Sequence, residues 1–158
     1  MKGSARVVVN AEVRPATLND LRTLGTWSGQ VEGVFRPAVE SDDQVLLVAF
    51  ANGRFPIGHV LVGLGGLRGT ISHLLVLAGF RDQGLGSALM AEAEDLIRGT
   101  GATQSRLAVE KVNVDAIRLY EHLGYMTAGE SVETWPEPVP DGTLQPVHHP
   151  AWVMKKSL

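Results

Sequence analysis

The sequence predicts an α/β fold with a mixed, mostly antiparallel twisted sheet flanked by helices, and three observations indicate it. Apolar segments separated by glycine-containing turns are typical of consecutive antiparallel strands, here Gln44–Phe50, Phe55–Leu64 and Thr70–Ala78. After them, apolar residues recur at helical spacing from Gly84 to Gly99 or Gly101. A strand and a helix then alternate once more. We expect residues 5–158 to form a single domain.

Turn residues and caps predict the bounds of the elements. Asn52-Gly53 indicates a type I′ hairpin, because both central positions of that turn require positive φ. Thr17 to Asp20 resembles a capping box, and Asn113 is a good N-cap for a helix that Gly124 ends. Further strands are expected at Val7–Val13, at Ser105–Glu110, from Tyr125 onward and at Ala151–Met154, with a short helix and loops between Trp27 and Glu40. Five prolines from Pro136 to Pro150 predict a connection that cannot pair continuously.

Composition restricts the classes of function. The 158 residues are 44% hydrophobic and 20% charged, as in an ordinary globular domain. The absence of cysteine excludes disulfides and a cysteine nucleophile, and His148-His149 has no further ligand at metal spacing, so no metal site is predicted. A formal net charge of -3 without a Lys/Arg block argues against nucleic acid. No apolar stretch is long enough to span a bilayer, so we expect no membrane partner and a cytoplasmic location.

The segment Arg81-Asp82-Gln83-Gly84-Leu85-Gly86 joins a strand to a helix and predicts an anion site. Glycines at 84 and 86 let backbone N–H groups approach a ligand, and the helix dipole adds positive potential. The segment lacks the Gly-Lys-Ser/Thr of a P-loop, and Leu89 stands where a dinucleotide fingerprint needs glycine. Tight helix–strand packing is the alternative role of the two glycines.

At these residues the sequence resembles the GCN5-related N-acetyltransferase (GNAT) superfamily. Its pattern Gln/Arg-x-x-Gly-x-Gly/Ala is matched by Arg81, Gly84 and Gly86. A second pattern, Asn-x-x-Ala-x-x-Leu-Tyr followed by a Gly-aromatic pair, is matched from Asn113 to Tyr125. The resemblance covers residues 13–155 in element order, and its specific part is 70–126. It implies a GNAT fold, acetyl-coenzyme A (acetyl-CoA) as co-substrate, and acetyl transfer to a primary amine by direct attack in a ternary complex.

The resemblance also implies where acetyl-CoA binds. In the family, the fourth strand splays from the fifth, and the pantetheine arm bonds backbone groups in the gap, which here belong to Val76, Leu77 and Ala78. The pyrophosphate contacts fall on the turn and the helix start, with Arg81 at the entrance, and comprise Gln83, Gly84, Leu85, Gly86 and Ser87. Asn113 stands where the family places an asparagine near the pantetheine, and a plain N-cap is its alternative role.

For the acid, the resemblance places Tyr120 where many members protonate the departing thiolate. A phenol can donate a hydrogen bond or a proton to a sulfur anion. Packing of a half-buried helix tyrosine is the alternative role.

For the base, an amine attacks a thioester only when neutral, so a proton must leave. The positions where some members carry a base hold Thr70, Ser72 and Ala108, and none of these can serve. Strand alternation puts Glu110 on the face of Ala108, which makes Glu110 the first candidate base. His73, expected to point away from Thr70 and Ser72, and a chain of water molecules are the alternatives.

The family builds its acceptor pocket from the first helices and from the connection between the last two strands, here Trp27 to Arg36 and Glu130 to His149. The connection carries Trp135 together with Glu130, Glu133, Glu137 and Asp141, which suit a cation unless the acids only solvate a loop. Its prolines are expected to narrow the pocket, which favours a small-molecule amine. A protein N-terminal or lysine acetyltransferase and a non-catalytic acyl-CoA-binding module are the alternative functions, and a homodimer is left open as the assembly.

Overall fold

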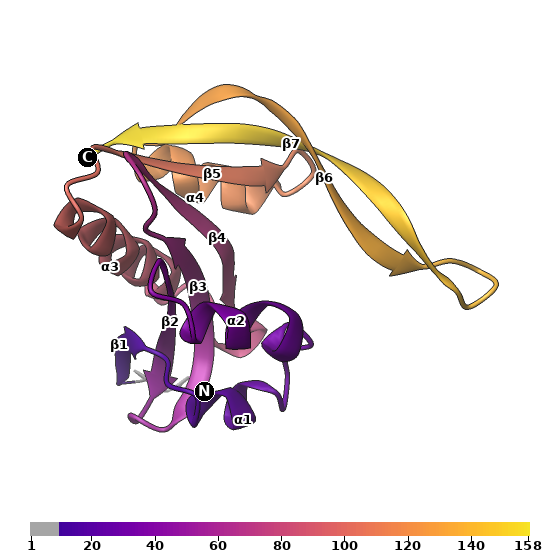
Figure 1. The fold of residues 1–158 in the computed structure, drawn as a ribbon, viewed down its shortest axis with the longest axis horizontal. Coiled ribbons are helices and arrows are strands. Elements are labelled where there is room, and N and C mark those ends of the chain that lie inside the picture. Colours follow the sequence, from indigo (N-terminus) through magenta and orange to yellow (C-terminus); the bar gives the residue numbers. More distant parts are fainter. Residues whose placement is uncertain (1–9) are drawn as a thin grey trace, which may run out of the picture.

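The computed structural model describes residues 10–158, whose strands form one seven-stranded sheet in the order β1-β2-β3-β4-β5-β7-β6 (Figure 1). The strands are β1 (Ala11–Pro15), β2 (Gln44–Ala51), β3 (Phe55–Gly63), β4 (Arg68–Val76), β5 (Gln104–Glu110), β6 (Met126–Pro138) and β7 (Leu144–Ser157). Only β4 and β5 pair in parallel, so the expected mixed, mostly antiparallel sheet is confirmed. Part of the strand expected at Val7–Val13 lies outside the described residues.

Six helical segments connect and cover these strands. They are α1 (Asp20–Leu24), the π-helical turn η1 (Val31–Phe35), α2 (Arg36–Val39), the 3₁₀ turn η2 (Ala78–Phe80), α3 (Leu85–Gly99) and α4 (Val114–His122). Asn52 and Gly53 both have positive φ, as the predicted hairpin turn requires. Within residues 10–158, no helix has both the length and the apolar character of a membrane span.

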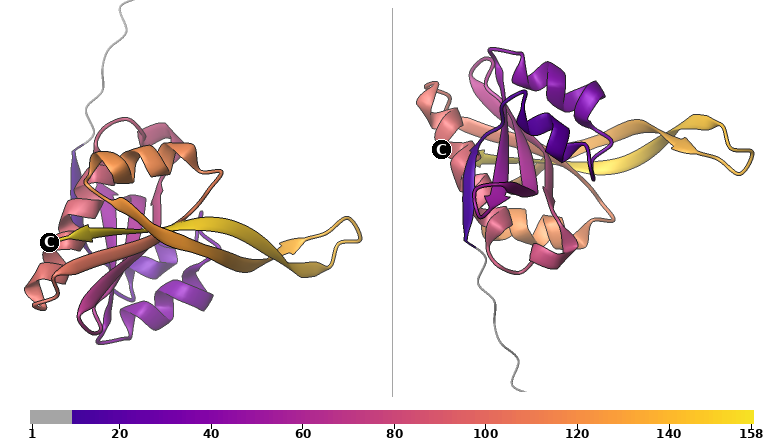
Figure 2. Two further views of the ribbon diagram at one scale, coloured as in Figure 1. Left: turned by 90° about the horizontal axis from the view of Figure 1, so that it is seen from above. Right: turned by 90° about the horizontal axis from the view of Figure 1, so that it is seen from below.

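Two apolar layers pack on opposite faces of the sheet. α3 covers one face, where the core includes Val60, Ile71 and Leu107. α1, η1 and α2 cover the other face, which we call the α1–α2 face, and their core includes Leu46, Val48, Phe50 and Leu61 (Figures 1 and 2). Because side chains alternate along a strand, Thr70 and Ser72 point to the α1–α2 face while Ile71 between them packs under α3.

The parallel pairing of β4 with β5 is short. It joins Arg68–Ile71 to Gln104–Leu107 and ends there, although both strands continue. A β-bulge follows in β4, because the register with β3 leaves His73 and Leu74 together opposite Val60. His73 has φ of 53°, a backbone conformation uncommon for residues other than glycine. A bulge bends the strand that carries it, so β4 leaves β5 and the predicted splayed pair is present.

The bulge also reverses the direction of His73, and the expectation that it points away from Ser72 is wrong. His73 is exposed, and its imidazole lies edge-on to Phe35 of the core under α1–α2, with ring centroids 6.1 Å apart. Its Nδ1 atom lies 3.0 Å from Ser72 Oγ. One extra residue shifts the alternation, so His73 shares the α1–α2 face with Thr70 and Ser72.

A second expectation, that the proline-rich segment 136–150 cannot pair, is also wrong. β6 and β7 pair from Met126↔Lys155 to Pro138↔Leu144 and form a long ribbon. Every second residue of the ribbon turns its backbone groups away from the partner strand, as the bond from Lys111 N–H to the Pro150 carbonyl shows. The prolines that fall on these alternate positions are Pro136, Pro138, Pro146 and Pro150. A proline at such a position removes no bond of the β6–β7 ladder.

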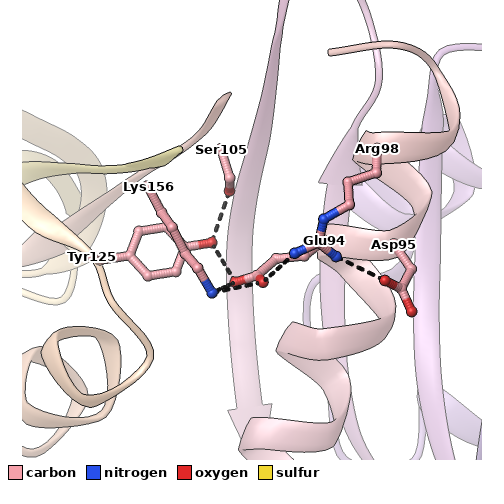
Figure 3. A network of polar contacts seen from close by, with 6 residues as sticks. All are labelled: Glu94, Asp95, Arg98, Ser105, Tyr125 and Lys156. Carbon is pink, nitrogen blue, oxygen red and sulfur yellow. Dashed lines mark hydrogen bonds and ion pairs between the residues drawn. The ribbon is translucent and has the colours of Figure 1, made fainter. Parts of the chain in front are cut away.

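A buried acid joins α3 to the β7 strand (Figure 3). Glu94 is only 5% exposed, and Lys156 Nζ lies 2.9 and 3.1 Å from its two carboxylate oxygens. The Tyr125 hydroxyl donates to Glu94 at 3.2 Å and contacts Ser105 Oγ at 2.8 Å, while Arg98 lies 3.7 Å away. A buried carboxylate is tolerated only with such partners.

We expect Lys156→Met to lower the free energy of unfolding by about 3 kcal/mol, because it leaves the Glu94 charge buried with only the more distant Arg98 to balance it. Urea unfolding measures the loss. The matched control is Lys155→Met, one residue earlier and exposed, which we expect to change the free energy by less than about 0.5 kcal/mol. Equal losses in the two variants would contradict the role of this ion pair.

Candidate functional site

A groove of about 790 Å³ runs between the end of β4 and α4. The bulged strand forms one wall, the turn before α3 closes one end, and α4 forms the other wall. Its lining residues are Leu74, Leu75, Val76, Phe80, Arg81, Asp82, Gly84, Leu85, Gly86, Ser87, Asn113, Asp115, Ala116 and Leu119. The structure therefore brings together the two segments that the sequence analysis singled out, 81–87 and 113–120.

The turn at the start of α3 is shaped by Gly84. This residue caps the helix in the left-handed conformation, with φ of 81°, and nothing lies within 4 Å of the position that a Cβ would take. The first backbone bond of the helix runs from Ala88 N–H to the Gly84 carbonyl, so the N–H groups of Leu85, Gly86 and Ser87 have no partner within the helix. Such amides at a helix N-terminus suit an anion.

Gly86 has a packing role as well. A Cβ at this position would lie 3.4 Å from Leu119 Cδ2 on α4, tighter than most side-chain contacts. The alternative interpretation of the glycines, close packing, therefore applies to Gly86, while Gly84 is needed for the backbone conformation.

The backbone of β4 alternates between β3 and the gap. Leu77 N–H donates to the Ile57 carbonyl of β3 at 2.9 Å, so the groups of its neighbour Val76 face the gap. Arg81 Nε donates to the Val76 carbonyl at 3.0 Å, which agrees with this direction. Val76 lines the groove, whereas Leu77, Ala78 and Gln83 are absent from its lining.

The position of Asn113 agrees with both of its expected roles. Its side-chain oxygen accepts a hydrogen bond from Ala116 N–H at 3.3 Å, so it is the N-cap of α4. It also lines the groove. Asp82 and Asp115, which the sequence analysis did not consider, line the groove too, so negative side chains flank the anion-binding turn.

Tyr120 lies beside the groove. It is 8% exposed in the core under α3 and contacts Tyr125 edge-on, with centroids 6.0 Å apart. Its helix neighbours Ala116 and Leu119 line the groove, but Tyr120 does not. Burial raises the pKa of Tyr120 to about 12, so its phenol stays protonated at neutral pH.

Glu110, at the end of β5, lies within ion-pair distance of the neighbouring ribbon. Its Oε2 atom lies 3.3 Å from His149 Nδ1, and His149 Nε2 lies 2.8 Å from Glu137 Oε1. Trp135 stacks on the His149 ring at 3.6 Å, with 4° between the planes. Alternation along β5 puts Glu110 on the same face of the sheet as Arg106. Arg106 pairs with Thr70 of β4, so this is the α1–α2 face.

This cluster changes the expected acceptor site. His149 covers a face of Trp135, Glu137 accepts a bond from Trp135 Nε1 at 2.9 Å, and Lys111 pairs with Glu130 at 2.8 Å. The predicted contact of a cation with the Trp135 face is therefore occupied by His149. The sequence analysis considered His149 only as a metal ligand and missed these contacts, because the partners of His149 come from β5 and β6.

The first helical segments cover the bulge with aromatic rings. His59 of β3 stacks on Trp27 at 5.5 Å and lies edge-on to Phe35 at 4.8 Å. Its Nδ1 lies 2.6 Å from the His73 carbonyl. Burial lowers the pKa of His59 to about 4 and lowers the pKa of His73 as well, so both imidazoles are neutral at pH 7.

Residues 10–158 have two further features of interest. A separate groove of about 670 Å³ runs along α1 and η1 and shares no lining residue with the groove at β4 and α4. In this described part of the chain, no group of metal-ligating side chains has a geometry suited to an ion.

Comparisons with known proteins agree with this geometry. The model of the acetyltransferase (GNAT) family matches residues 13–125. An acetyltransferase of Pectobacterium atrosepticum is 35% identical over 86 residues, which make up 54% of this chain and only 60% of that protein.

Two solved structures have the same fold. The ribosomal-protein-S18-alanine N-acetyltransferase of Escherichia coli has 21% identity and a TM-score of 0.73, with 94% of each chain covered. A putative streptothricin acetyltransferase of Bacillus anthracis, in complex with acetyl-CoA, has 16% identity and a TM-score of 0.73, with 94% of this chain and 100% of that chain covered. The family model matches most of the chain, and the residues that line the groove lie within the matched range. This chain therefore belongs to the GNAT acetyltransferase family.

Proposed function

We propose that this protein transfers an acetyl group from acetyl-CoA to the primary amine of a small molecule, by direct attack in a ternary complex. The observation that carries the proposal is the groove between β4 and α4, which ends on the Gly84 turn. Family membership supports acetyl-CoA as the donor.

The groove offers each part of the donor a suitable surface. The pyrophosphate would bind the N–H groups of Gly84 to Ser87, with Arg81 offsetting the charges of Asp82 and Asp115. The pantetheine arm would follow the backbone of Leu74 to Val76, and the thioester would reach the gap between β4 and β5. A backbone N–H in this part of β4 would stabilise the oxyanion of the tetrahedral intermediate.

Glu110 is the proposed base. It would accept the proton that the amine loses on attack, with His149 holding one of its carboxylate oxygens. The bulge strengthens the case for a second candidate, His73, because it brings a neutral imidazole to the α1–α2 face, where Glu110 also lies. Substitution of each residue in turn distinguishes the two candidates.

Tyr120 is the proposed acid. With its pKa near 12, the phenol is a weaker acid than a thiol, which titrates near 8.5 in cysteine, so its proton stays on oxygen even as the thiolate develops. Its contribution is then a hydrogen bond to the leaving sulfur, strengthened by the dry surroundings.

The acceptor is proposed to be a small cationic amine. Negative side chains on the ribbon beside Glu110, including Glu133 and Glu137, favour a cation near the gap. The prolines give no reason to expect a narrowed pocket, because residues 136–150 form part of the ribbon. Peptide N-termini and lysines therefore belong in the same assay, as does a thioester hydrolysis control for a non-catalytic binding module.

Acetyl-CoA at saturating concentration is expected to raise the melting temperature by about 5–10 °C, because it binds the native state only. Gly84→Val is expected to abolish the shift, since a β-branched residue is strained at positive φ and crowds the anion. Gly99→Val, at the other end of α3, is the control and should keep the shift. A normal shift in Gly84→Val would remove the turn from the binding site.

Glu110→Gln is expected to lower kcat/KM by about 100-fold, with the acetyl-CoA shift unchanged. Thiol release from acetyl-CoA, measured with a panel of diamines, amino sugars and short peptides, gives the rates. His149→Asn keeps an N–H near the place of Nδ1 and should lose less activity than His149→Ala. His148→Ala, on the opposite face of the ribbon, is the control. If Glu110→Gln keeps full activity and His73→Gln loses it, the base is His73.

Tyr120→Phe is expected to lower kcat by about 10- to 100-fold without changing the affinity for acetyl-CoA. Tyr125→Phe is the matched control: it loses bonds to Glu94 and Ser105, so it should lower the melting temperature but leave kcat unchanged. The opposite pattern, with kcat reduced only in Tyr125→Phe, would rule out Tyr120 as the acid.

A further inference from the structure

Arg106 of β5 is a partly buried cation without a counter-ion. Its Nε atom is buried and has no hydrogen-bond partner among residues 10–158. Arg106 also takes part in none of the ion pairs of this described part of the chain. Buried polar atoms are normally hydrogen-bonded and buried charges are normally paired, so this exception calls for a partner from outside the chain.

The strand neighbours of Arg106 add positive charge and no negative charge. Arg106 pairs with Thr70 of β4 on one side and with Lys155 of β7 on the other, so the three residues share the α1–α2 face. Arg68, two residues before Thr70, lies on the same face. Like charges on directly opposite residues, as in Arg106 and Lys155, destabilise a sheet, and a bound anion would remove this repulsion. The other residues on this face of segments 68–72, 104–108 and 153–157 are uncharged: Thr70, Ser72, Gln104, Ala108, Val153 and Ser157.

The sheet around Arg106 is open on the α1–α2 face. Among the described residues, the core under α1–α2 includes strand residues of β2 and β3 and none of β5. Thr70, Ser72 and Ala108 are accordingly exposed. Arg106 does not line the groove at β4 and α4, so the phosphates of acetyl-CoA bound there are not its partner. The missing partner therefore belongs to a second molecule that reaches this face.

The place of Arg106 relative to the gap fits the acetyl acceptor. The pairing of β4 with β5 ends at Ile71 and Leu107, and the gap opens beyond them. Ala108 is the first residue of β5 past this point on the α1–α2 face. Arg106 precedes Ala108 by two residues and Glu110 follows it by two, so each lies about 7 Å from it along the strand. An amine at Ala108 then has the Glu110 carboxylate on one side and the Arg106 guanidinium on the other.

We propose that the acetyl acceptor is a small amine that also carries an anionic group, and that Arg106 binds this group. The inference rests on the proposed acetyl transfer and restricts its acceptor. A guanidinium binds a carboxylate or a phosphate through two parallel hydrogen bonds, so amino acids and phosphorylated amines both fit. The anionic group takes no part in the bond changes. The amine nitrogen forms the new amide bond, the thioester C–S bond breaks, and the proton that the amine loses passes to the base.

Matched pairs of acceptors test the proposal. β-Alanine and 4-aminobutyrate are each compared with their amides, which keep the amine and the shape but lose the negative charge. Phosphoethanolamine is compared with ethanolamine in the same way. In the wild-type protein, kcat/KM is expected to favour the charged member of at least one pair about 100-fold, because its neutral counterpart loses two charge-assisted hydrogen bonds. The pair that shows the preference distinguishes a carboxylate from a phosphate.

Arg106→Gln is expected to bring this ratio close to 1 while changing kcat/KM for the neutral member by less than about threefold. Comparing the ratio between variants cancels differences in basicity between the amines. Arg106→Lys keeps the charge without the planar fork and should retain a preference of about 10-fold. Arg54→Gln, exposed at the turn between β2 and β3, removes the same charge elsewhere and should keep the full ratio. A retained acetyl-CoA melting shift shows that each variant is folded.

The outcomes separate this proposal from the acetyl transfer on which it rests. A wild-type protein that acetylates charged and neutral members equally would overturn the role of the anionic group and leave acetyl transfer standing. So would an Arg106→Gln variant that keeps the full preference. Absence of transfer to every acceptor, neutral amines included, would instead overturn the proposed function, and this inference with it.

Discussion

The short pairing between β4 and β5 is the constraint on which the rest of the structure depends. Four residues of each strand hold the two halves of the sheet together, and then the bulge at His73 turns β4 away. Were the ladder to continue, the backbone groups of Val76 would be used by β5 and no gap would open. The same bulge turns His73 onto the α1–α2 face and lets the His59 ring reach the His73 carbonyl. A positive φ at a histidine is tolerated here because aromatic packing and this contact hold it in place.

Burial around the gap shifts the pKa values of several titratable groups, each in the direction that favours the uncharged form. It lowers the pKa of His59 to about 4 and that of His73, and it raises the pKa of Tyr120 to about 12. Neutral imidazoles and a protonated phenol suit a reaction in which a neutral amine attacks and a thiolate departs. Glu110 and Glu137 lie further out, where each contacts His149 at the base of the ribbon.

Features that depend on neighbours in the chain could be predicted from the sequence. The Gly84 turn, the Asn113 cap and the amphipathic pattern of α3 each lie within a few residues, so spacing alone indicates them. The direction of His73 could not be predicted, because a bulge depends on how β4 and β3 align. The contact of His149 with Glu110 joins residues 39 positions apart, and no local pattern marks it. The prolines were misinterpreted for a related reason: their effect depends on which alternate position each occupies, and only the register between β6 and β7 decides that.

Those prolines have a consequence for solubility. A ribbon that projects into solvent normally exposes rows of free N–H and C=O groups, which recruit further strands and lead to fibres. In this ribbon the outward backbone positions at 136, 138, 146 and 150 are prolines and have no N–H to offer. Neither edge can therefore present an unbroken row of donors to an incoming strand. The protein can extend a long hairpin away from its core without turning it into a seed for aggregation.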